Sequence, residues 1–330
     1  MLRIAKLSFK GLVHFGQTGI GIEEVEEVIH SDTLFSAFCH SWAKLYGKAK
    51  LDELLTLFLN QTPPFFLSSC FIYNGDTYFL PKPHTFPPGF ETPELREEYG
   101  KVVKKMAYLP REIFELWIKR EKIDYKSLVK DFPEYSSSYV FHLIPRVSIG
   151  RIGATSQIYH CGAVVFRKGC GLFFIVKFND PSYSDKVEKT FSHLGELGLG
   201  GERSQGFGRF ELLWEDCNKK WYELFNHRGD SFLCISLFHP NKEEFDEKLI
   251  EEASYTLLER KGWFQSPFSR KQYKRKSVTM FAEGSVFGKR IKGHLVDVTS
   301  EIWKKEKNYH PIYRYGFALT LKVNRGETKK

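Results

Sequence analysis

The sequence has few cysteines, and none of them lies at the spacing of a metal site. There are six among 330 residues, and they form no Cys-X-X-Cys pair and no Cys/His cluster at zinc spacing. We interpret them as reduced thiols that are mostly buried. We therefore expect neither a structural metal nor a cofactor.

Long apolar runs and familiar catalytic patterns are also missing. The longest run, 172–176, is far too short to cross a bilayer, and Lys and Arg interrupt residues 1–15, unlike a signal peptide. We expect a cytoplasmic protein. The GxSxG, HExxH, Walker and protein-kinase patterns are absent, which excludes the enzyme classes that depend on them.

Positive charge is in excess. The chain has 49 Lys and Arg against 40 Asp and Glu, a formal net charge of +9, and 16% of its residues are aromatic. This excess favours an anionic partner, either nucleic acid or a membrane surface. A membrane-surface protein is disfavoured because no strongly basic amphipathic helix is evident.

The segment 198–210, GLGGERSQGFGRF, contains five glycines, and its position limits what it can do. A helix is predicted over 185–197, where Val187, Phe191 and Leu194 share one face, and a strand is predicted over 210–214. Because the glycines follow a helix and precede a strand, they cannot form a P-loop or dinucleotide site. The segment could bind an anion through backbone amides, Arg203 and Arg209, or simply end the helix and turn the chain.

Two further stretches are basic. Residues 145–159, PRVSIGRIGATSQIY, contain no acid, and Arg146 and Arg151 flank Ser148 and Gly150. Residues 260–276 contain seven basic residues and no acid, interleaved with aromatic residues. Such a mixture is typical of single-stranded RNA binding, but 260–276 could equally be an exposed charged hairpin.

The coarse order of elements predicts an α+β fold. Residues 2–9 read as a strand, Ser31 or Asp32 as the N-cap of a helix that Gly47 ends, and Asn74–Gly75 as the turn of a hairpin. We expect a ferredoxin-like domain over 1–217, with an insertion at about 81–157, and a small α+β domain over 228–330. The remaining expectations are a short helix at 51–59, loops at 81–93 and 131–138, a helical stretch at 96–130, a polar linker at 218–228 and a helix at 243–253.

His30 is the one residue that suggests catalysis. It precedes a helix, where the helix dipole disfavours the imidazolium, and with a Tyr or Lys it could catalyse metal-independent RNA cleavage. It could instead only fix the start of the helix. Asp32 could be a metal ligand or a base, although an N-cap is the better use of Asp at that position.

Several motifs together resemble a known family. They are the glycine segment 198–210, HSDTLFSAFC at 30–39, PRVSIGRIGATSQIY at 145–159, MFAEGSVF at 280–287 and HPIYRYGFAL at 310–319. The glycine segment is similar to that of the RAMP superfamily of CRISPR proteins. The combination resembles the Csm-type subunit that caps the crRNA 5′ end in type III-A interference complexes. One departure is IGR at 149–151, where an acid is expected before Arg151, so the role of Gly150 stays open.

The resemblance implies two RRM-like (ferredoxin-like) domains, a non-catalytic function, and an insertion that acts as a thumb on the RNA. It implies three partners: the repeat-derived crRNA 5′ handle, a large polymerase-like subunit and a backbone RAMP subunit. The alternative is a metal-independent CRISPR repeat endoribonuclease that uses His30. The RNA contacts implied are His30, Ser31, Arg146, Ser148, Arg151, Gly200, Gly201, Arg203, Ser204 and Gln205.

Overall fold

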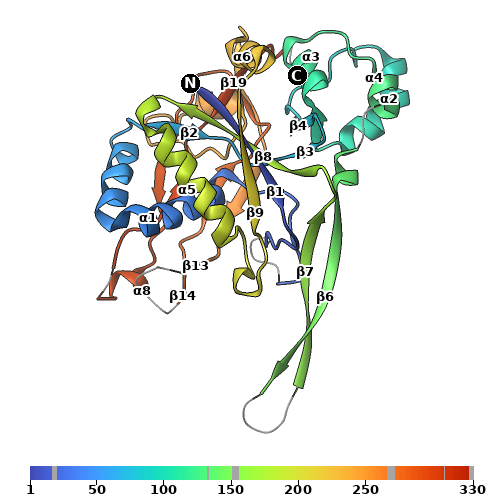
Figure 1. Ribbon diagram of the computed structural model, residues 1–330. Coiled ribbons are helices and arrows are strands. Elements are labelled where there is room, and N and C mark those ends of the chain that lie inside the picture. The colour runs from blue at the N-terminus through green and yellow to red at the C-terminus, as the bar shows by residue number, and fades with distance from the viewer. Residues whose placement is uncertain (17–20, 132–133, 151–155, 266–271, 308, 327–330) are drawn as a thin grey trace.

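The computed structural model describes residues 1–16, 21–131, 134–150, 156–265, 272–307 and 309–326. It is a mixed α+β protein whose strands pair antiparallel. The largest sheet has the order β5-β4-β3-β8-β1-β9, and β2 also pairs with β8 (Figure 1). Its strands are β1 (Leu2–Phe9), β2 (Phe65–Leu67), β3 (Phe71–Asn74), β4 (Thr77–Pro81), β5 (Tyr108–Pro110), β8 (Cys170–Phe178) and β9 (Phe210–Asp216).

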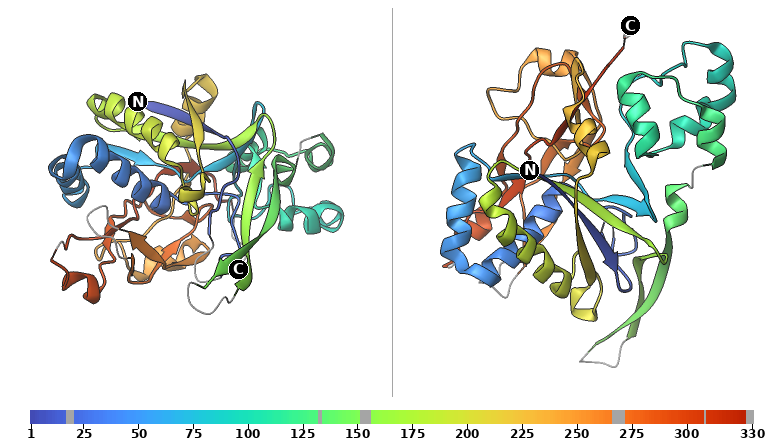
Figure 2. Two further views of the ribbon diagram at one scale, coloured as in Figure 1. Left: turned by 60° about the horizontal axis from the view of Figure 1, so that its bottom comes forward. Right: turned by 45° about the horizontal axis from the view of Figure 1, so that its top comes forward.

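Both faces of this sheet are buried. Ala5 and Leu7 of β1 join one hydrophobic cluster with residues of α1 (Ser31–Leu59) and α5 (Ser184–Leu197), which lie on that face. Leu2 and Ile4, which alternate with them, join a second cluster on the other face. The views from two further directions agree on this arrangement (Figure 2). Strand β1 is therefore held by packing on both of its faces.

The predicted helices and hairpin of this part are largely confirmed. The helix over 185–197 is α5, and Val187, Phe191 and Leu194 are fully buried. Gly47 has φ +84°, outside the helical region, so it separates the two helical stretches that together make α1. Gly75, with φ +57°, forms the β3–β4 turn.

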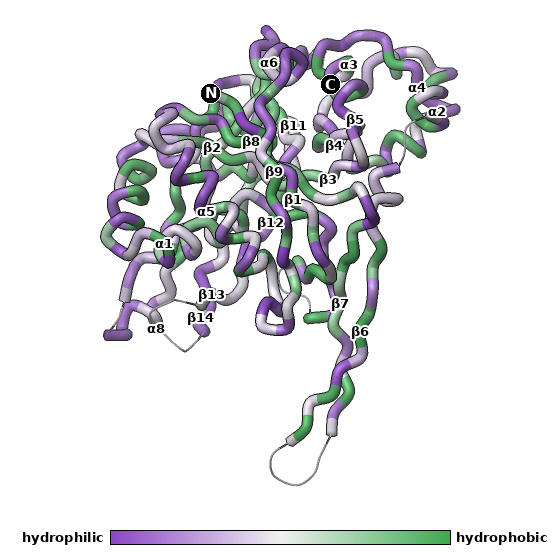
Figure 3. Tube along the Cα trace, viewed as in Figure 1, coloured by the Kyte–Doolittle hydropathy of each residue, from purple (hydrophilic) through white to green (hydrophobic). Residues whose placement is uncertain are grey.

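The chain between β4 and β8 forms a helical unit and then a long hairpin. The hairpin consists of β6 (Tyr139–Ile149) and β7 (Ser156–Phe166) and projects away from the body (Figures 1 and 2). Apolar residues run along it (Figure 3), and several of them are exposed: Phe141, Leu143, Val147, Ile149 and Ile158. The helical unit contains α2 (Pro93–Lys105), α3 (Arg111–Lys119), α4 (Tyr125–Asp131) and the short 3₁₀ helix η1 (Tyr135–Ser138).

The polar linker predicted at 218–228 is wrong, because most of it is the helix α6 (Lys219–Asn226). The Asn218 side chain accepts a hydrogen bond from the Trp221 amide and caps the helix. Trp221 and Leu224 are buried, and the Trp221 ring contacts Tyr78 and Phe173 of the central sheet. The composition of the stretch is polar, but two apolar residues three positions apart are enough to fix a short helix on a core.

The second half of the chain continues from α6. It begins with a sheet of order β11-β16-β10-β19, and the predicted helix at 243–253 is shorter than expected. Its core is continuous with that of the first half, because Tyr315 and Phe317 pack with Phe58 of α1. The elements are β10 (Ser231–Cys234), α7 (Glu247–Glu251), β11 (Ala253–Ser254), β12 (Leu257–Arg260), β13 (Trp263–Gln265), β14 (Gln272–Lys274), β15 (Val278–Phe281), β16 (Val286–Phe287), β17 (Leu295–Asp297), α8 (Glu301–Lys304), β18 (Tyr313–Tyr315) and β19 (Thr320–Val323).

Replacing Trp221 with Ala should destabilise the protein by about 3–5 kcal/mol, since it removes a buried aromatic ring and leaves a cavity against the sheet. The neighbouring Tyr222 is 41% exposed on the same helix and provides a matched control. We expect Tyr222→Ala to change the unfolding free energy by only about 0.5 kcal/mol. Urea denaturation of both variants measures this, and equal effects would contradict the assignment of α6 as a core helix.

Candidate functional site

A cleft of about 1480 Å³ runs between the two halves of the chain. It is lined by α1, by the loop after α5, by β13 and β14, and by residues 310–314. Positive charge dominates its walls, since the described lining residues include two acids, Glu26 and Asp52, and seven basic residues. The seven are Lys48, Arg203, Arg260, Lys261, Lys274, Arg275 and Arg314.

Glycines of the loop 198–208 allow its backbone to approach other backbone segments closely. A Cβ atom on Gly200 would lie 2.5 Å from the His14 carbonyl oxygen, and one on Gly208 would lie 2.1 Å from the Leu199 oxygen. Both glycines have positive φ. The amide of Gly201 donates to the His14 oxygen at 2.8 Å. The Gly201 amide is therefore not available for the predicted binding of an anion by backbone amides. It holds the loop to His14 instead.

The structure brings the basic stretch 145–159 and the glycine segment 198–210 together at Arg146. Its guanidinium donates to a Glu202 carboxylate oxygen at 2.6 Å and lies 5.4 Å from the centre of the Phe207 ring. Glu202 has φ +53°, a left-handed conformation uncommon for a residue other than Gly. Burial lowers the pKa of Arg146, but the Glu202 carboxylate outweighs it and raises that pKa. The hairpin and the loop thus form one surface beside the cleft.

The other predicted contacts of the loop and hairpin are on the surface. Arg203, Ser204 and Gln205 form the exposed 3₁₀ helix η3 (Arg203–Gln205), and Arg203 lines the cleft. Ser148 is exposed on β6, opposite Gln157 and two residues nearer the hairpin tip than Arg146. Arg151 lies outside the described residues.

His40 on α1 lines the cleft near two cations. Burial is the main cause that lowers the pKa of His40 to about 4, and the charges of Lys44 and Arg203 lower it further. The ring is therefore neutral at physiological pH and adds no charge to the cleft.

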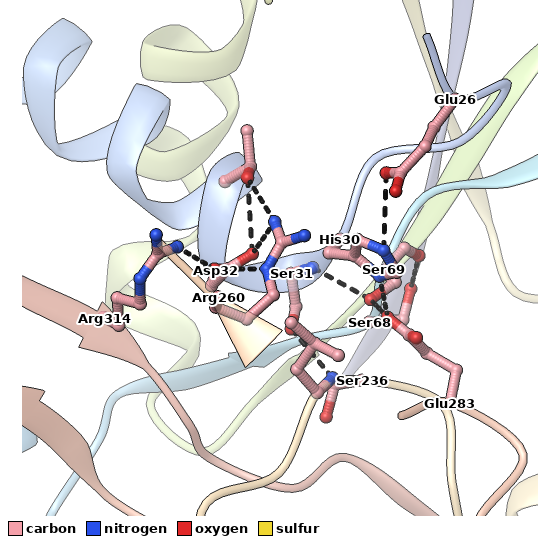
Figure 4. Close-up of polar contacts among 12 residues, drawn as sticks. Glu26, His30, Ser31, Asp32, Ser68, Ser69, Ser236, Arg260, Glu283 and Arg314 are labelled. Atoms are coloured by element: carbon pink, nitrogen blue, oxygen red, sulfur yellow. Dashed lines mark hydrogen bonds and ion pairs between the residues drawn. The ribbon is translucent and has the colours of Figure 1, made fainter. Parts of the chain in front are cut away.

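His30 is bound by carboxylates on both sides. Its Nδ1 lies 2.9 Å from a Glu283 oxygen and its Nε2 lies 3.5 Å from a Glu26 oxygen (Figure 4). Burial favours the neutral ring, but Glu283 outweighs it, and the pKa of His30 is raised above 6.5. The expectation that the helix dipole disfavours the imidazolium is thus overridden by two acids that are distant in sequence.

Ser31 is fully buried and holds the start of α1 against the second half of the chain. Its amide donates to the Ser69 hydroxyl at 2.8 Å, and its own hydroxyl accepts from the Leu237 amide at 3.0 Å. It is not the N-cap, because His30 occupies that position and makes no side-chain capping hydrogen bond. A direct contact between the Ser31 side chain and a ligand is incompatible with this burial.

Asp32 is not an N-cap either, and both of its oxygens are occupied by guanidinium groups. Arg260 donates to the two oxygens at 3.1 and 3.0 Å, and Arg314 donates to one of them (Figure 4). Burial alone would raise the pKa of Asp32, but Arg260 and Arg314 hold it well below 3.8. The carboxylate is therefore an ion-pair partner, not a metal ligand or a base.

The structure also adds cleft residues that the predicted contacts omit. Arg260 and Arg275 lie at the ends of the basic stretch 260–276, and Arg314 lies in HPIYRYGFAL, so the sequence motifs contained the signal. Their positions on one wall depend on strand pairing across the second half. Within the described ranges, no three His, Cys, Asp or Glu side chains gather as a metal site would require, and no helix has the length and apolarity to cross a membrane.

Comparison with known proteins identifies the class. The profile of the RAMP superfamily matches residues 6–211, which is more than half of the chain, and the chain belongs to this superfamily. The profile described as the CRISPR Csm4 C-terminal domain matches residues 227–323.

Curated relatives carry the Csm4 name. The chain is 26% identical to the CRISPR system Cms protein Csm4 of Thermococcus onnurineus over 305 residues, which cover 90% of this chain and 92% of that protein. It is 26% identical to Csm4 of Streptococcus thermophilus over 292 residues, covering 86% and 88%. The predicted resemblance to a Csm-type RAMP subunit is therefore confirmed.

Solved structures share the fold. A chain of the Csm1–Csm4 cassette in complex with AMPPNP superposes with a TM-score of 0.66 at 22% identity, covering 99% of each chain. A chain of the Csm3–Csm4 subcomplex of the type III-A CRISPR-Cas interference complex superposes with a TM-score of 0.65 at 19% identity, covering 98% of this chain and 100% of that one.

Replacing Asp32 with Asn should destabilise the protein by roughly 3–5 kcal/mol at pH 7, because two buried guanidinium groups lose their counter-charge. The pKa of Asp32 is lower in the folded state than in the unfolded state. The contribution of Asp32 to the unfolding free energy is therefore fully present above pH 4 and is lost as the pH falls through the folded-state pKa of this carboxyl.

Urea unfolding of wild type and Asp32→Asn at pH 7, and at steps below pH 4, measures the difference. The difference in unfolding free energy between wild type and Asp32→Asn should become smaller as the pH falls. The control is Asp52→Asn, since Asp52 forms an exposed pair with Lys48 and should cost less than about 1 kcal/mol. A difference in unfolding free energy that does not change with pH would contradict the ion-pair assignment.

Proposed function

We propose that this protein is the Csm4-type subunit of a type III-A CRISPR effector complex and that it binds the repeat-derived 5′ handle of crRNA without catalysing a reaction. We place that complex in the cytoplasm. The relatives named Csm4 support the subunit type. The observation that carries RNA binding is the contact of Arg146 with the loop 198–208 beside a cleft of excess positive charge.

The proposed function fits a ferredoxin-like first domain over 1–217. The antiparallel order β3-β8-β1-β9, with α1 between β1 and β3 and α5 between β8 and β9, supports a split βαβ assignment. We propose a second RRM-like domain over 228–330, and an insertion between roughly 81 and 157 whose hairpin extends the RNA-binding surface. The glycine-rich loop joins α5 to β9 at the cleft.

The cleft offers the two kinds of contact that single-stranded RNA uses. Lys261, Lys274 and Arg203 are exposed cations that could pair with phosphates. Trp263 is 59% exposed on the cleft wall, with the Lys274 ammonium 5.3 Å from its ring centre, and provides a face for base stacking. We retain Gly200, Arg203, Ser204, Gln205, Arg146, Ser148 and Arg151 as proposed RNA contacts, Gly201 as a close backbone approach, and His30 as a wall residue.

The related structures support a proposal of two protein partners. Those relatives were solved as a Csm1–Csm4 cassette and a Csm3–Csm4 subcomplex. We propose that this chain likewise joins the large polymerase-like subunit to the backbone RAMP subunit. The exposed apolar residues of the β6–β7 hairpin, such as Phe141 and Ile149, are suited to contacts outside the chain.

The alternative of a repeat endoribonuclease is weaker. General base catalysis by His30 requires a neutral nitrogen that can reach a 2′-hydroxyl. The ring is engaged by Glu283 and Glu26, its side chain is 11% exposed, and its pKa is raised. These features favour a cation that fixes the start of α1.

Purification of the tagged protein from its host should recover short RNAs that share one 5′ end, together with a large subunit and a backbone RAMP subunit. Sequencing of the bound RNA and mass spectrometry of the proteins measure this. RNAs with random 5′ ends would contradict handle binding. Cleavage of repeat RNA at one position in EDTA, abolished by His30→Ala, would overturn the non-catalytic assignment.

Replacing Arg146 with Ala should weaken binding of handle RNA about tenfold, the scale of one lost charge-assisted hydrogen bond. Glu202→Ala releases the Arg146 guanidinium and removes a negative charge, so binding should be unchanged or tighter. Fluorescence anisotropy with a labelled RNA measures both. Lys168→Ala, in the exposed turn between β7 and β8, is the charge-matched control for Arg146→Ala.

Comparison of Arg146→Ala with Glu202→Ala distinguishes a direct contact of Arg146 with RNA from a purely structural role in the loop. If Arg146 only braces the loop 198–208, then Arg146→Ala and Glu202→Ala should weaken binding to the same extent. Equal losses would therefore contradict a direct contact between Arg146 and RNA.

A further inference from the structure

Three arginines from the second half of the chain line the cleft together. We call Arg260, Arg275 and Arg314 the arginine cluster. Arg260 ends β12, Arg275 follows β14, and Arg314 lies in β18. None of the three is among the RNA contacts expected from the sequence, all of which lie in the first half of the chain.

Asp32 neutralises only part of this cluster. It accepts hydrogen bonds from Arg260 and Arg314, whereas the guanidinium of Arg275 donates to the Ser36 hydroxyl, at 3.2 Å. The Nε atoms of Arg275 and Arg314 are buried and have no hydrogen-bond partner in the part of the chain that the structure describes. Two buried donors in one cluster are thus left unsatisfied, which is costly unless a ligand accepts from them.

The nearest other acids do not balance the cluster. Glu26 and Glu283 act on Arg260 only at a distance. Both contact His30, whose ring is itself cationic when protonated, and Glu283 also accepts from the Ser69 hydroxyl. Burial, and then the charge of Arg314, lowers the pKa of Arg275 to about 10. Arg275 is therefore a desolvated cation beside other cations, an arrangement that an anion would relieve.

One hydroxyl donor adds to the site. Ser36 lines the cleft and accepts from Arg275, so its own proton can donate to a ligand, whereas the hydroxyls of Thr33 and Ser277 donate to Asp32 and Glu259. Guanidinium groups match the oxygens of a phosphate in geometry and charge, and a hydroxyl can donate to an oxygen that remains. We propose that the arginine cluster binds one phosphodiester group of the RNA, with Arg275 as the principal contact and Asp32 as the residue that positions Arg260 and Arg314.

The neighbourhood favours a phosphate within a strand of RNA over a free nucleotide. Trp263 pairs with Lys274, the residue before Arg275, and its exposed ring provides a stacking face beside the cluster. The cleft, at about 1480 Å³, also exceeds the roughly 300–1,000 Å³ of small-molecule pockets. This inference rests on the proposed function, because it presumes that RNA occupies the cleft.

The test is Arg275→Gln in the full chain, because Arg275 takes no part in the Asp32 ion pairs and its loss leaves them intact. The probe is a fluorescent RNA that begins with the host's repeat-derived handle. We expect affinity to fall roughly 10- to 100-fold, the range for hydrogen bonds to a charged group. The slope of log affinity against log salt should become shallower by about 0.7, the value for one phosphate of a single strand.

The control is Lys276→Gln, the same charge change one residue away. Lys276 is exposed, pairs with Glu301 at 2.8 Å and does not line the cleft, so affinity should stay within about twofold. If wild type prefers handle RNA over a shuffled RNA but Arg275→Gln matches wild type in affinity and slope, the phosphate site is overturned and the proposed function stands. If wild type shows no preference for the handle, the proposed function itself fails.

A second measurement separates the loss of a phosphate contact from a general defect of the variant. RNAs that carry a single neutral methylphosphonate at successive handle positions are bound to the wild-type protein. One position should lose affinity by the same factor as Arg275→Gln, and at that position the variant should show no additional loss. Losses that add at every position would overturn the assignment.

Discussion

The ion pairs of Asp32 with Arg260 and Arg314 are the interaction on which the rest of the structure depends. They join the first turn of α1 to β12 and β18, which are more than two hundred residues away in the sequence. Breaking a buried ion pair costs far more than forming it contributes, because the remaining charge is left in a low dielectric. The two halves of the chain are therefore held in one relative position, and the cleft between them has fixed walls.

The same ion pairs determine the character of the cleft. Asp32 takes up two guanidinium groups and fixes their direction, but it cannot neutralise three. The wall therefore keeps an excess of positive charge that is already desolvated. Beside the cleft, Arg146 and Arg203 of the loop 198–208 add further basic side chains. A strand of RNA bound as proposed would meet these cations, the arginine wall and the exposed Trp263.

The glycines of the loop 198–208 act through packing more than through their amides. Leu199 and Gly201 donate their N–H groups to other backbone carbonyls, which close the loop against itself and against His14. Gly200 and Gly208 are needed because a Cβ atom would collide with a carbonyl oxygen. The loop can thus present Arg203 and its neighbours on a short, fixed 3₁₀ turn. Rigid backbone and exposed side chains together make a surface that loses little entropy on binding.

The sequence by itself determined the elements whose signal is local. The strand at 2–9, the helix before the glycines and the Asn74–Gly75 hairpin follow from periodicity and turn chemistry, which act over a few residues. The sequence also contains the basic stretches and the motifs that carry the family resemblance. Only the tertiary structure decided the partners of His30, Ser31 and Asp32, because Glu283, Leu237, Arg260 and Arg314 reach them through long-range packing. The helix at 219–226 also depended on tertiary structure. Its Trp221 packs against Tyr78 of the sheet, which is distant in the sequence, so local sequence patterns did not predict it.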